Sequence, residues 1–564
     1  MDTTADTGST NWPTRMTLVL AFAGLLFFAR LSERALWSEE VRWAQIPREM
    51  VQSGDYLWPT LNGRTYYDKP LGSYWLVLLA SLFTGGVDET SARLPSACSG
   101  LLAVAFAMLI ARRIYDDDTA ILTGVILATS FSFAFFARNA SADVETIAGV
   151  LAALWLFLRN EDKPPGGWTV VLWFVMALTS LTKGLLGFVL PVLIITLYSA
   201  LKPRDGSPWV RARQSWLLNR WSFLAVPLAV LVYLGPFFLS MAAGGSTEGL
   251  EMVYRENVRR FFDPVNHRAP IYLYAYVIFM LLAPWSLLLP AALVHAHFVA
   301  YDSNRVPSQG APHDWNRTPR NTECGRAFAL AYFWGTFIFF TLSSSRRSYY
   351  LLPILPAAAF LIARMLTACA VWSRATYAFV LVGFSLLSMA VLLSIAALLG
   401  TAWLPEPWDR LPPLPCPWAF VSAWLLAVVS IGYACLQLCP RRIAWSFGVI
   451  AFSFMAYLYL FALPATEGYR TQKPFADAVK QLVGPDFDKI ALYRTRDIVF
   501  YLDAPGPIAE YHTKEEVQRG RWVILRRRDW DGLKLIGNVL IEETVQPWEE
   551  ATAAENKLVL VQIR

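Results

Sequence analysis

Residues 36–70 read LWSEEVRWAQIPREMVQSGDYLWPTLNGRTYYDKP and follow the first membrane-length apolar run of the chain. The segment holds two adjacent carboxylates, Glu39 and Glu40, followed by Arg42, and an Asp-Lys pair closes it before a proline. Strongly apolar chains rarely keep so many ionisable groups near a bilayer unless the groups pair or take part in function. We therefore predict that this segment is an outer loop of a membrane protein and carries its active site.

The composition of the chain supports the membrane assignment. Of its 564 residues, 55% are hydrophobic and 16% are charged, and the mean hydropathy is +0.39. These values are typical of a polytopic membrane protein. The net charge of +6 comes from scattered basic residues, which favours contacts with membrane lipids over binding of nucleic acid. The six cysteines have neither CxxC nor zinc-ligand spacing, so we interpret them as packing residues.

A membrane-spanning helix needs about 20 mostly apolar residues. Runs of this kind predict about 13 transmembrane helices in an α-helical domain over residues 15–465, with an outer loop at 33–89 and a mobile cytoplasmic N-terminus at 1–14. The runs lie near residues 15–32, 90–112, 117–136, 141–159, 167–182, 184–201, 221–241, 270–298, 326–344, 349–368, 375–400, 417–439 and 443–463.

The orientation follows from the basic residues of the loops, because Lys and Arg concentrate in cytoplasmic loops. If the N-terminus is cytoplasmic, the inner loops of this chain are clearly richer in Lys and Arg than the outer loops. The basic residues that remain outside recur beside carboxylates or histidine, as an outward-facing site for an anionic ligand would require. An odd number of spans then places the C-terminal segment outside as well.

The last segment, residues 466–564, has a different character. Short runs typical of β-strands (KIALY, DIVFYL, RWVILRR, NVLIEE and KLVLVQI) alternate with helical patterns such as FADAVKQLV and TKEEVQRG. This alternation predicts a small soluble α/β domain.

The predicted topology gathers ionisable and hydroxyl side chains at the outer helix ends. A polyprenyl or lipid phosphate lies at that depth and needs cations and hydroxyls, because hydrocarbon does not solvate its charge. We predict that Lys69, Arg260 and Tyr350 bind such a phosphate. The gathered set comprises Arg138, the segments 254–270 and 343–353, and the residues of the first loop and helix ends. The ten predicted site residues within it are Glu39, Glu40, Arg42, Asp68, Lys69, Asp143, Lys183, Arg260, His267 and Tyr350.

Each of these residues also has an ordinary structural interpretation. Glu39 and Glu40 suit the first turn of a helix, where the helix dipole favours acidic residues. Asp143 or Ser141 could cap a helix. Lysines and arginines can extend to lipid headgroups, and tyrosines often lie in the interfacial belt. His267, taken alone, also fits an ordinary surface histidine.

Several charged and aromatic motifs follow one another along the membrane part. They are WSEEVRW (37–43), IPREM (46–50), SGD (53–55), YDKP (67–70) with YW (74–75), LTKG (181–184), ENVRRF (256–261) with HRAP (267–270), and SYYLLP (348–353). These motifs resemble those of the GT-C membrane glycosyltransferases of the protein O-mannosyltransferase and aminoarabinose transferase superfamily. The last two motifs are most similar to the lipid A aminoarabinose transferase branch.

The resemblance implies a GT-C fold with thirteen helices and a periplasmic C-terminal α/β domain. It implies transfer of a sugar, 4-amino-4-deoxy-L-arabinose in the most similar branch, from undecaprenyl phosphate to a lipid A phosphate by a protein that we expect to be a monomer. By resemblance, Glu39 takes the place of the essential first carboxylate of the family and Asp143 that of a second acidic residue, and we predict that Glu40 is catalytic as well. Lys69, Arg260 and Tyr350 take the place of ligands of the donor phosphate, and we predict that Arg42 and Lys183 also bind this phosphate. No cofactor is required, although Asp68 and His267 match positions where a divalent metal can bind.

One departure from the family pattern concerns the first carboxylate, which is Glu39 here and Asp in the family. The extra methylene moves the charge by about 1 Å or more in a site where geometry decides the rate, so the sugar or acceptor can differ. Three alternatives remain open: a hexosyl, hexuronosyl or protein O-mannosyl transferase of the same architecture, a lipid flippase, and a structural or signalling membrane protein. A flippase would place ionisable residues along a path through the bilayer, whereas here they gather at one face.

Overall fold

The computed structural model describes most of the membrane part and most of the C-terminal segment. The described residues are 11–37, 39–202, 215–244, 246–262, 269–298, 320–368, 440–464, 471–544 and 555–563, with single helical positions between 422 and 433. His267 and the predicted run at 375–400 lie outside these residues.

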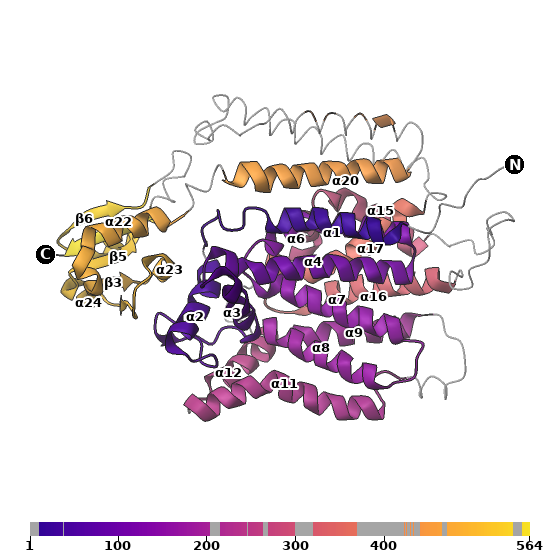
Figure 1. Ribbon diagram of the computed structural model, residues 1–564, viewed down its shortest axis with the longest axis horizontal. Helices are drawn as coiled ribbons and strands as arrows, with labels where there is room; N and C mark the ends of the chain where they lie inside the picture. Colours follow the sequence, from indigo (N-terminus) through magenta and orange to yellow (C-terminus); the bar gives the residue numbers. More distant parts are fainter. Residues whose placement is uncertain are drawn as a thin grey trace.

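Long helices run side by side through the membrane part (Figure 1). Among the described residues, five helical segments are long and apolar enough to cross a membrane, or six if one bent pair forms a single span. The five are α4 (Glu89–Ile114), α11 (Arg220–Gly244), Glu323–Leu342 of α16 (Arg320–Leu342), Ser348–Thr367, which contains α17 (Leu355–Thr367), and Trp445–Ala462, which begins within α20 (Pro440–Tyr457). The total of about 13 transmembrane helices therefore remains a prediction.

Other predicted spans correspond to shorter or broken helices. The bent pair is α5 (Asp117–Thr129) and α6 (Phe131–Ala137), which meet at 68°. The predicted run at 270–298 is interrupted between α14 (Leu273–Leu281) and α15 (Leu289–Phe298). The remaining helices of the bundle are α1 (Trp12–Phe28), α7 (Ala142–Asn160), α8 (Gly167–Lys183) and α9 (Leu186–Leu201).

The loop between α1 and α4 is built from short elements at one end of the bundle (Figure 1). It contains α2 (Glu40–Ser53), the hairpin of β1 (Thr60–Leu61) and β2 (Arg64–Thr65), and α3 (Gly72–Thr84). The sequence analysis did not predict α3, an apolar helix of 13 residues. Because α3 is shorter than a membrane span, a search for runs of about 20 residues overlooks it.

The C-terminal segment forms a five-stranded mixed sheet in the order β4-β3-β5-β7-β6. Its strands are β3 (Ile490–Tyr493), β4 (Ala509–Tyr511), β5 (Trp522–Arg526), β6 (Gly537–Glu542) and β7 (Leu558–Ile563). The strand order is parallel from β4 through β3 to β5, and antiparallel from β5 through β7 to β6. Helices α22 (Lys473–Val483) and α24 (Lys514–Arg519) match the predicted helical patterns.

One predicted strand of this segment is wrong. The run DIVFYL contains a short helix, α23 (Val499–Leu502), whose four residues are all buried. A short, fully apolar run has no periodicity that separates a buried strand from a buried helix. The strand beside β3 is instead β4, which the sequence analysis did not identify.

The C-terminal sheet holds the outer loop at two places. Asn62, at the tip of the β1–β2 hairpin, donates to Ile508 O at 2.8 Å and accepts from Ile508 N at 2.7 Å. Arg48 of α2 donates to Phe500 O at 2.8 Å, and its guanidinium lies 3.7 Å from the centre of the Phe500 ring. The helix that begins beside Glu39 is therefore anchored from the side opposite the membrane bundle.

Gly63 offers a direct test of the contact between the hairpin and the sheet. It has a φ of +71°, and a Cβ atom at this position would lie 2.4 Å from Pro507 Cγ. We expect Gly63→Ala to destabilise the folded protein by about 1 kcal/mol or more, since both the backbone conformation and the close approach oppose a side chain. Thermal unfolding in detergent measures this, with Gly506→Ala as the control because nothing lies within 4 Å of its added Cβ. An unchanged unfolding temperature for Gly63→Ala would show that the contact does not contribute.

Candidate active site

A cavity of about 810 Å³ lies where the outer loop meets the ends of the bundle helices. Nine of the ten predicted site residues line it, and the tenth, His267, lies outside the described residues. The lining contains eight basic side chains and five carboxylates, a surplus of three positive charges. The basic residues are Arg34, Arg42, Lys69, Lys183, Arg255, Arg259, Arg260 and Arg347, and the carboxylates are Glu39, Glu40, Asp68, Asp143 and Glu256.

Lys69 lies at the centre of one charged network in this cavity. Its Nζ is 3.2 Å from Asp68 Oδ2 and 3.2 Å from Glu256 Oε2. Arg42 contacts the same Asp68 oxygen at 2.8 Å. Burial acts to raise the pKa of Asp68, but Lys69 and Arg42 outweigh it, so the pKa lies below its usual value. Asp68 is therefore ionised at neutral pH and holds both cations in place.

Arg260 joins this network from the other side of the cavity. It follows a π-helical turn, η1 (Arg255–Arg259), and such turns are frequent at functional sites. Its guanidinium donates to Glu256 and, at 2.9 Å, to the hydroxyl of Tyr350. Its Nε donates to Ser345 Oγ at 3.4 Å. Lys69, Arg260 and Tyr350, which the sequence predicted as phosphate ligands, are thus linked through Glu256.

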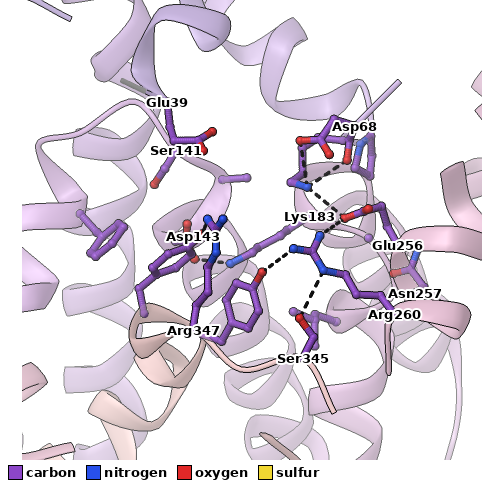
Figure 2. A pocket seen from close by; sticks show the side chains of 18 of the residues that line it. Glu39, Asp68, Ser141, Asp143, Lys183, Glu256, Asn257, Arg260, Ser345 and Arg347 are labelled. Carbon is purple, nitrogen blue, oxygen red and sulfur yellow. Dashed lines mark hydrogen bonds and ion pairs between the residues drawn. The ribbon is translucent and has the colours of Figure 1, made fainter. Parts of the chain in front are cut away.

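Asp143 and Lys183 form a second charged pair (Figure 2). Asp143 lies in the first turn of α7 and Lys183 is the last residue of α8, so the helix dipole favours each charge. Gly184 follows with a φ of +93°, and a Cβ there would lie 2.4 Å from Asn257 Oδ1. The same oxygen accepts from Leu185 N at 2.8 Å, which fixes the turn between α8 and α9. Ser141 occupies the N-cap of α7 without a side-chain cap hydrogen bond, so capping does not explain Asp143.

The two predicted carboxylates of the outer loop have different surroundings. Both oxygens of Glu40 bind Arg93, each at 2.8 Å, and Ala140 N donates to Glu40 at 2.9 Å. Burial acts to raise the pKa of Glu40, but Arg93 and Ala140 outweigh it and hold the pKa below its usual value. Glu39 has 57% of its side chain exposed and contacts Arg42 at 2.8 Å. Of the pair, Glu39 is therefore the carboxylate that a substrate can reach.

The described residues around Asp68 do not fit a metal site. Within the part of the chain that the structure describes, no three His, Cys, Asp or Glu side chains are grouped to hold a metal ion. Asp68 is already neutralised by two cations. The reaction that we propose uses no metal.

Several residues of the site were not assigned a role from the sequence. Glu256, Asn257 and Ser345 line the cavity, and Glu256 contacts both Lys69 and Arg260. Arg93 holds Glu40 from within α4. A basic residue inside a predicted membrane span is itself an indication of function or pairing, and this criterion would have identified Arg93.

The amino-acid sequence is similar to that of characterised membrane glycosyltransferases. Residues 68–236 match a family model described as dolichyl-phosphate-mannose-protein mannosyltransferase. An undecaprenyl phosphate-alpha-4-amino-4-deoxy-L-arabinose arabinosyl transferase of Pseudomonas fluorescens is 29% identical over 359 residues, covering 62% of this chain and 56% of that protein. The Pseudomonas paraeruginosa enzyme of that name is 32% identical over 288 residues, covering 50% of each chain. The matched part of the chain spans about half the length of these curated relatives.

Solved structures agree over a larger part of the chain. The crystal structure of ArnT from Cupriavidus metallidurans bound to undecaprenyl phosphate has a TM-score of 0.68 and 21% identity, and covers 98% of both chains. The oligosaccharyltransferase AglB of Archaeoglobus fulgidus has a TM-score of 0.52 and 11% identity, and covers 93% of this chain and 70% of that one. The chain is therefore a multi-pass membrane protein with the GT-C glycosyltransferase fold, and its sequence is similar to the aminoarabinose transferases, as its motifs indicated.

Proposed function

We propose that the protein transfers 4-amino-4-deoxy-L-arabinose from undecaprenyl phosphate to a phosphate of lipid A. The observation that carries the proposal is the network of Lys69, Arg260 and Tyr350 around Glu256, on the same cavity as Glu39 and Asp143. Two cations and a hydroxyl at one point suit a phosphate oxygen, because hydrogen bonds between charged groups are the strong ones. The names of the sequence relatives supply the sugar and its lipid carrier.

The charge of the cavity favours a phosphate as the acceptor. A sugar linked to undecaprenyl phosphate is a phosphodiester with one negative charge, whereas the lining has a surplus of three positive charges. A hydroxyl acceptor would leave most of this surplus uncompensated. A phosphomonoester brings close to two further negative charges at neutral pH and compensates it.

In the proposed reaction, an oxygen of the acceptor phosphate attacks the anomeric carbon while the bond from that carbon to the oxygen of the donor phosphate breaks. The electron pair stays on the leaving phosphate, which gains one negative charge. Lys69, Arg260 and Tyr350 stabilise that charge as it forms. The acceptor phosphate is ionised and needs no strong base. Glu39 and Asp143 orient the acceptor and balance positive charge that develops on the sugar.

The oligomeric state, the membrane and the orientation of the enzyme are also part of what we propose. We infer a monomer in the bacterial inner membrane, with about 13 transmembrane helices, a cytoplasmic N-terminus, and the cavity and the α/β segment 466–564 in the periplasm. In this arrangement the acceptor reaches the cavity from the outer leaflet. The C-terminal segment supports the outer loop through Arg48 and Asn62. A divalent metal at Asp68 and His267 is not part of the mechanism.

The test is transfer by the purified protein in lipid nanodiscs. We expect wild type to add a pentosamine mass to lipid A from its undecaprenyl phosphate donor, as measured by mass spectrometry. The Glu39→Gln, Asp143→Asn double variant should lose about 100-fold or more of this rate, because it removes the two carboxylates that act on the sugar and acceptor.

Glu248→Gln is the matched control, since Glu248 is exposed, acidic and not among the cavity residues. It should retain the wild-type rate. Full transfer by the double variant would contradict the proposed roles of Glu39 and Asp143. Transfer of a hexose instead of the pentosamine, or transfer to a dephosphorylated acceptor, would contradict the assignment of sugar or acceptor.

A further inference from the structure

Two groups of charged side chains lie in the cavity (Figure 2), and Arg42 connects them because it contacts both Glu39 and Asp68 at 2.8 Å. The donor side comprises Asp68, Lys69, Glu256, Arg260 and Ser345, which hydrogen bonds and ion pairs join into one network. The other group contains Glu39, Asp143 and Arg347, which lie on the opposite side of the Lys183 side chain in this view. The Lys183 ammonium contacts Asp143 and so belongs to the second group.

Two tyrosines contact the cations, and one of them, Tyr350, contacts cations of both groups. The Lys183 ammonium is 5.6 Å from the centre of the Tyr349 ring and 5.4 Å from that of Tyr350. Arg347 donates to the Tyr349 hydroxyl at 2.6 Å, and its guanidinium lies 5.7 Å from the same ring. Cations over aromatic faces are attracted by the ring quadrupole, more strongly when partly desolvated. Lys183 and Arg347 are therefore held at one place beside Tyr349.

The backbone fixes the distance between the two groups. Arg347 precedes the 3₁₀ turn η3 (Ser348–Ile354), and Tyr350 N donates to Arg347 O at 3.1 Å. Both Arg347, which caps the turn, and Tyr350, which lies within it, line the cavity. The Tyr350 hydroxyl accepts from Arg260 on the donor side, whereas Arg347 donates to the Tyr349 hydroxyl. The turn η3 and the residue directly before it thus provide contacts to both groups of charged side chains.

We infer that Arg347, with Lys183, binds the phosphate of the acceptor, so that Lys183 acts on the acceptor and not on the sugar donor. This inference rests on the proposed function. Displacement at the anomeric carbon requires the attacking and leaving oxygens on opposite faces of the sugar. The leaving phosphate occupies Lys69, Arg260 and Tyr350, so the acceptor phosphate requires cations across the cavity, and Arg347 and Lys183 are in that position beside Asp143.

The test measures the KM of each substrate separately in zwitterionic nanodiscs. For Arg347→Gln we expect the KM of lipid A to rise about tenfold or more, because a charge-assisted contact is lost, while the KM of the donor lipid stays unchanged. Arg347→Lys should recover part of the loss, because it restores the charge without the planar fork. Inorganic phosphate should compete with lipid A in wild type and compete less in Arg347→Gln.

The adjacent arginine provides a matched control. Arg346 donates to Thr341 O and to Ala269 O, and it does not line the cavity. Arg346→Gln should leave both KM values unchanged. For Arg347→Gln, a rise only in the donor KM, or no change in either KM, would overturn the inference and leave the proposed function standing. A rise seen only in anionic nanodiscs would assign Arg347 to lipid headgroups and also overturn it. Absence of transfer by wild type would instead reject the proposed function itself.

Discussion

Replacing Lys69 by alanine should lower the kcat/KM of transfer by about 100-fold or more. The Lys69 ammonium lies between the carboxylates of Asp68 and Glu256, 3.2 Å from each. Without it, one cation fewer faces the leaving phosphate, and the two carboxylates repel that phosphate instead. Removing one group that stabilises charge in a transition state typically costs about 10²–10³ in rate. Single-turnover transfer from the undecaprenyl phosphate donor to lipid A measures the effect.

A second variant separates loss of charge from loss of structure. Lys69→Arg keeps the positive charge and should retain measurable transfer, although the planar guanidinium of arginine fits imperfectly in a site that holds an ammonium. Lys473→Ala is the matched control, because Lys473 is half exposed, pairs with Glu89 at 3.6 Å and does not line the cavity. If Lys69→Ala kept the wild-type rate while binding less donor lipid, Lys69 would contribute to ground-state binding only. That result would contradict the catalytic role that we propose for Lys69.

The structure brings nine of the ten predicted site residues to one cavity, whereas several predicted elements differ from the observed ones. Lys69 and Arg260 were chosen as candidates because charged groups near a bilayer stand out against an apolar chain. Their mutual contacts could not be predicted, since these depend on Glu256 and on a π-helical turn that has no periodicity of its own. The side chains lie in segments far apart in the sequence, and only the packing of the bundle brings them together.

The elements that were missed share a physical cause. Helix α3 is too short to be recognised as a span, and α23 is too short to show a helical period. Tertiary contacts decide such segments: the carbonyl of Phe500 in α23 accepts from Arg48, which satisfies one of the groups that a helix end leaves unpaired. Short apolar segments therefore take their structure from their neighbours, whereas five of the long predicted runs contain helices long and apolar enough to cross a membrane.

The buried pair of Glu40 and Arg93 should have the largest effect on stability. Arg93 is 1% exposed and donates to the carbonyls of Leu31, Arg34 and Ala35 as well as to Glu40. We expect Arg93→Met to lower the free energy of unfolding by about 3–5 kcal/mol, because it leaves a buried carboxylate without its partner. Thermal and denaturant unfolding in detergent measure this. Arg364→Met is the control, since it removes a charge that contacts Asp116 at the other end of the bundle.

The same pair explains how the fold places the two carboxylates that we propose to be catalytic, Glu39 and Asp143. Arg93 holds the chain before Glu39, and Ser96, one turn further along α4, donates to Ser141 O at 2.8 Å, just before Asp143. One face of α4 therefore fixes both loops that reach the cavity. Replacing the pair with apolar residues, Glu40→Leu with Arg93→Met, should recover much of the stability that Arg93→Met loses, because no unpaired charge remains. It should not recover transfer, since the loop carbonyls lose their donor. Recovery of both stability and transfer would show that the pair only stabilises the fold and does not position Glu39.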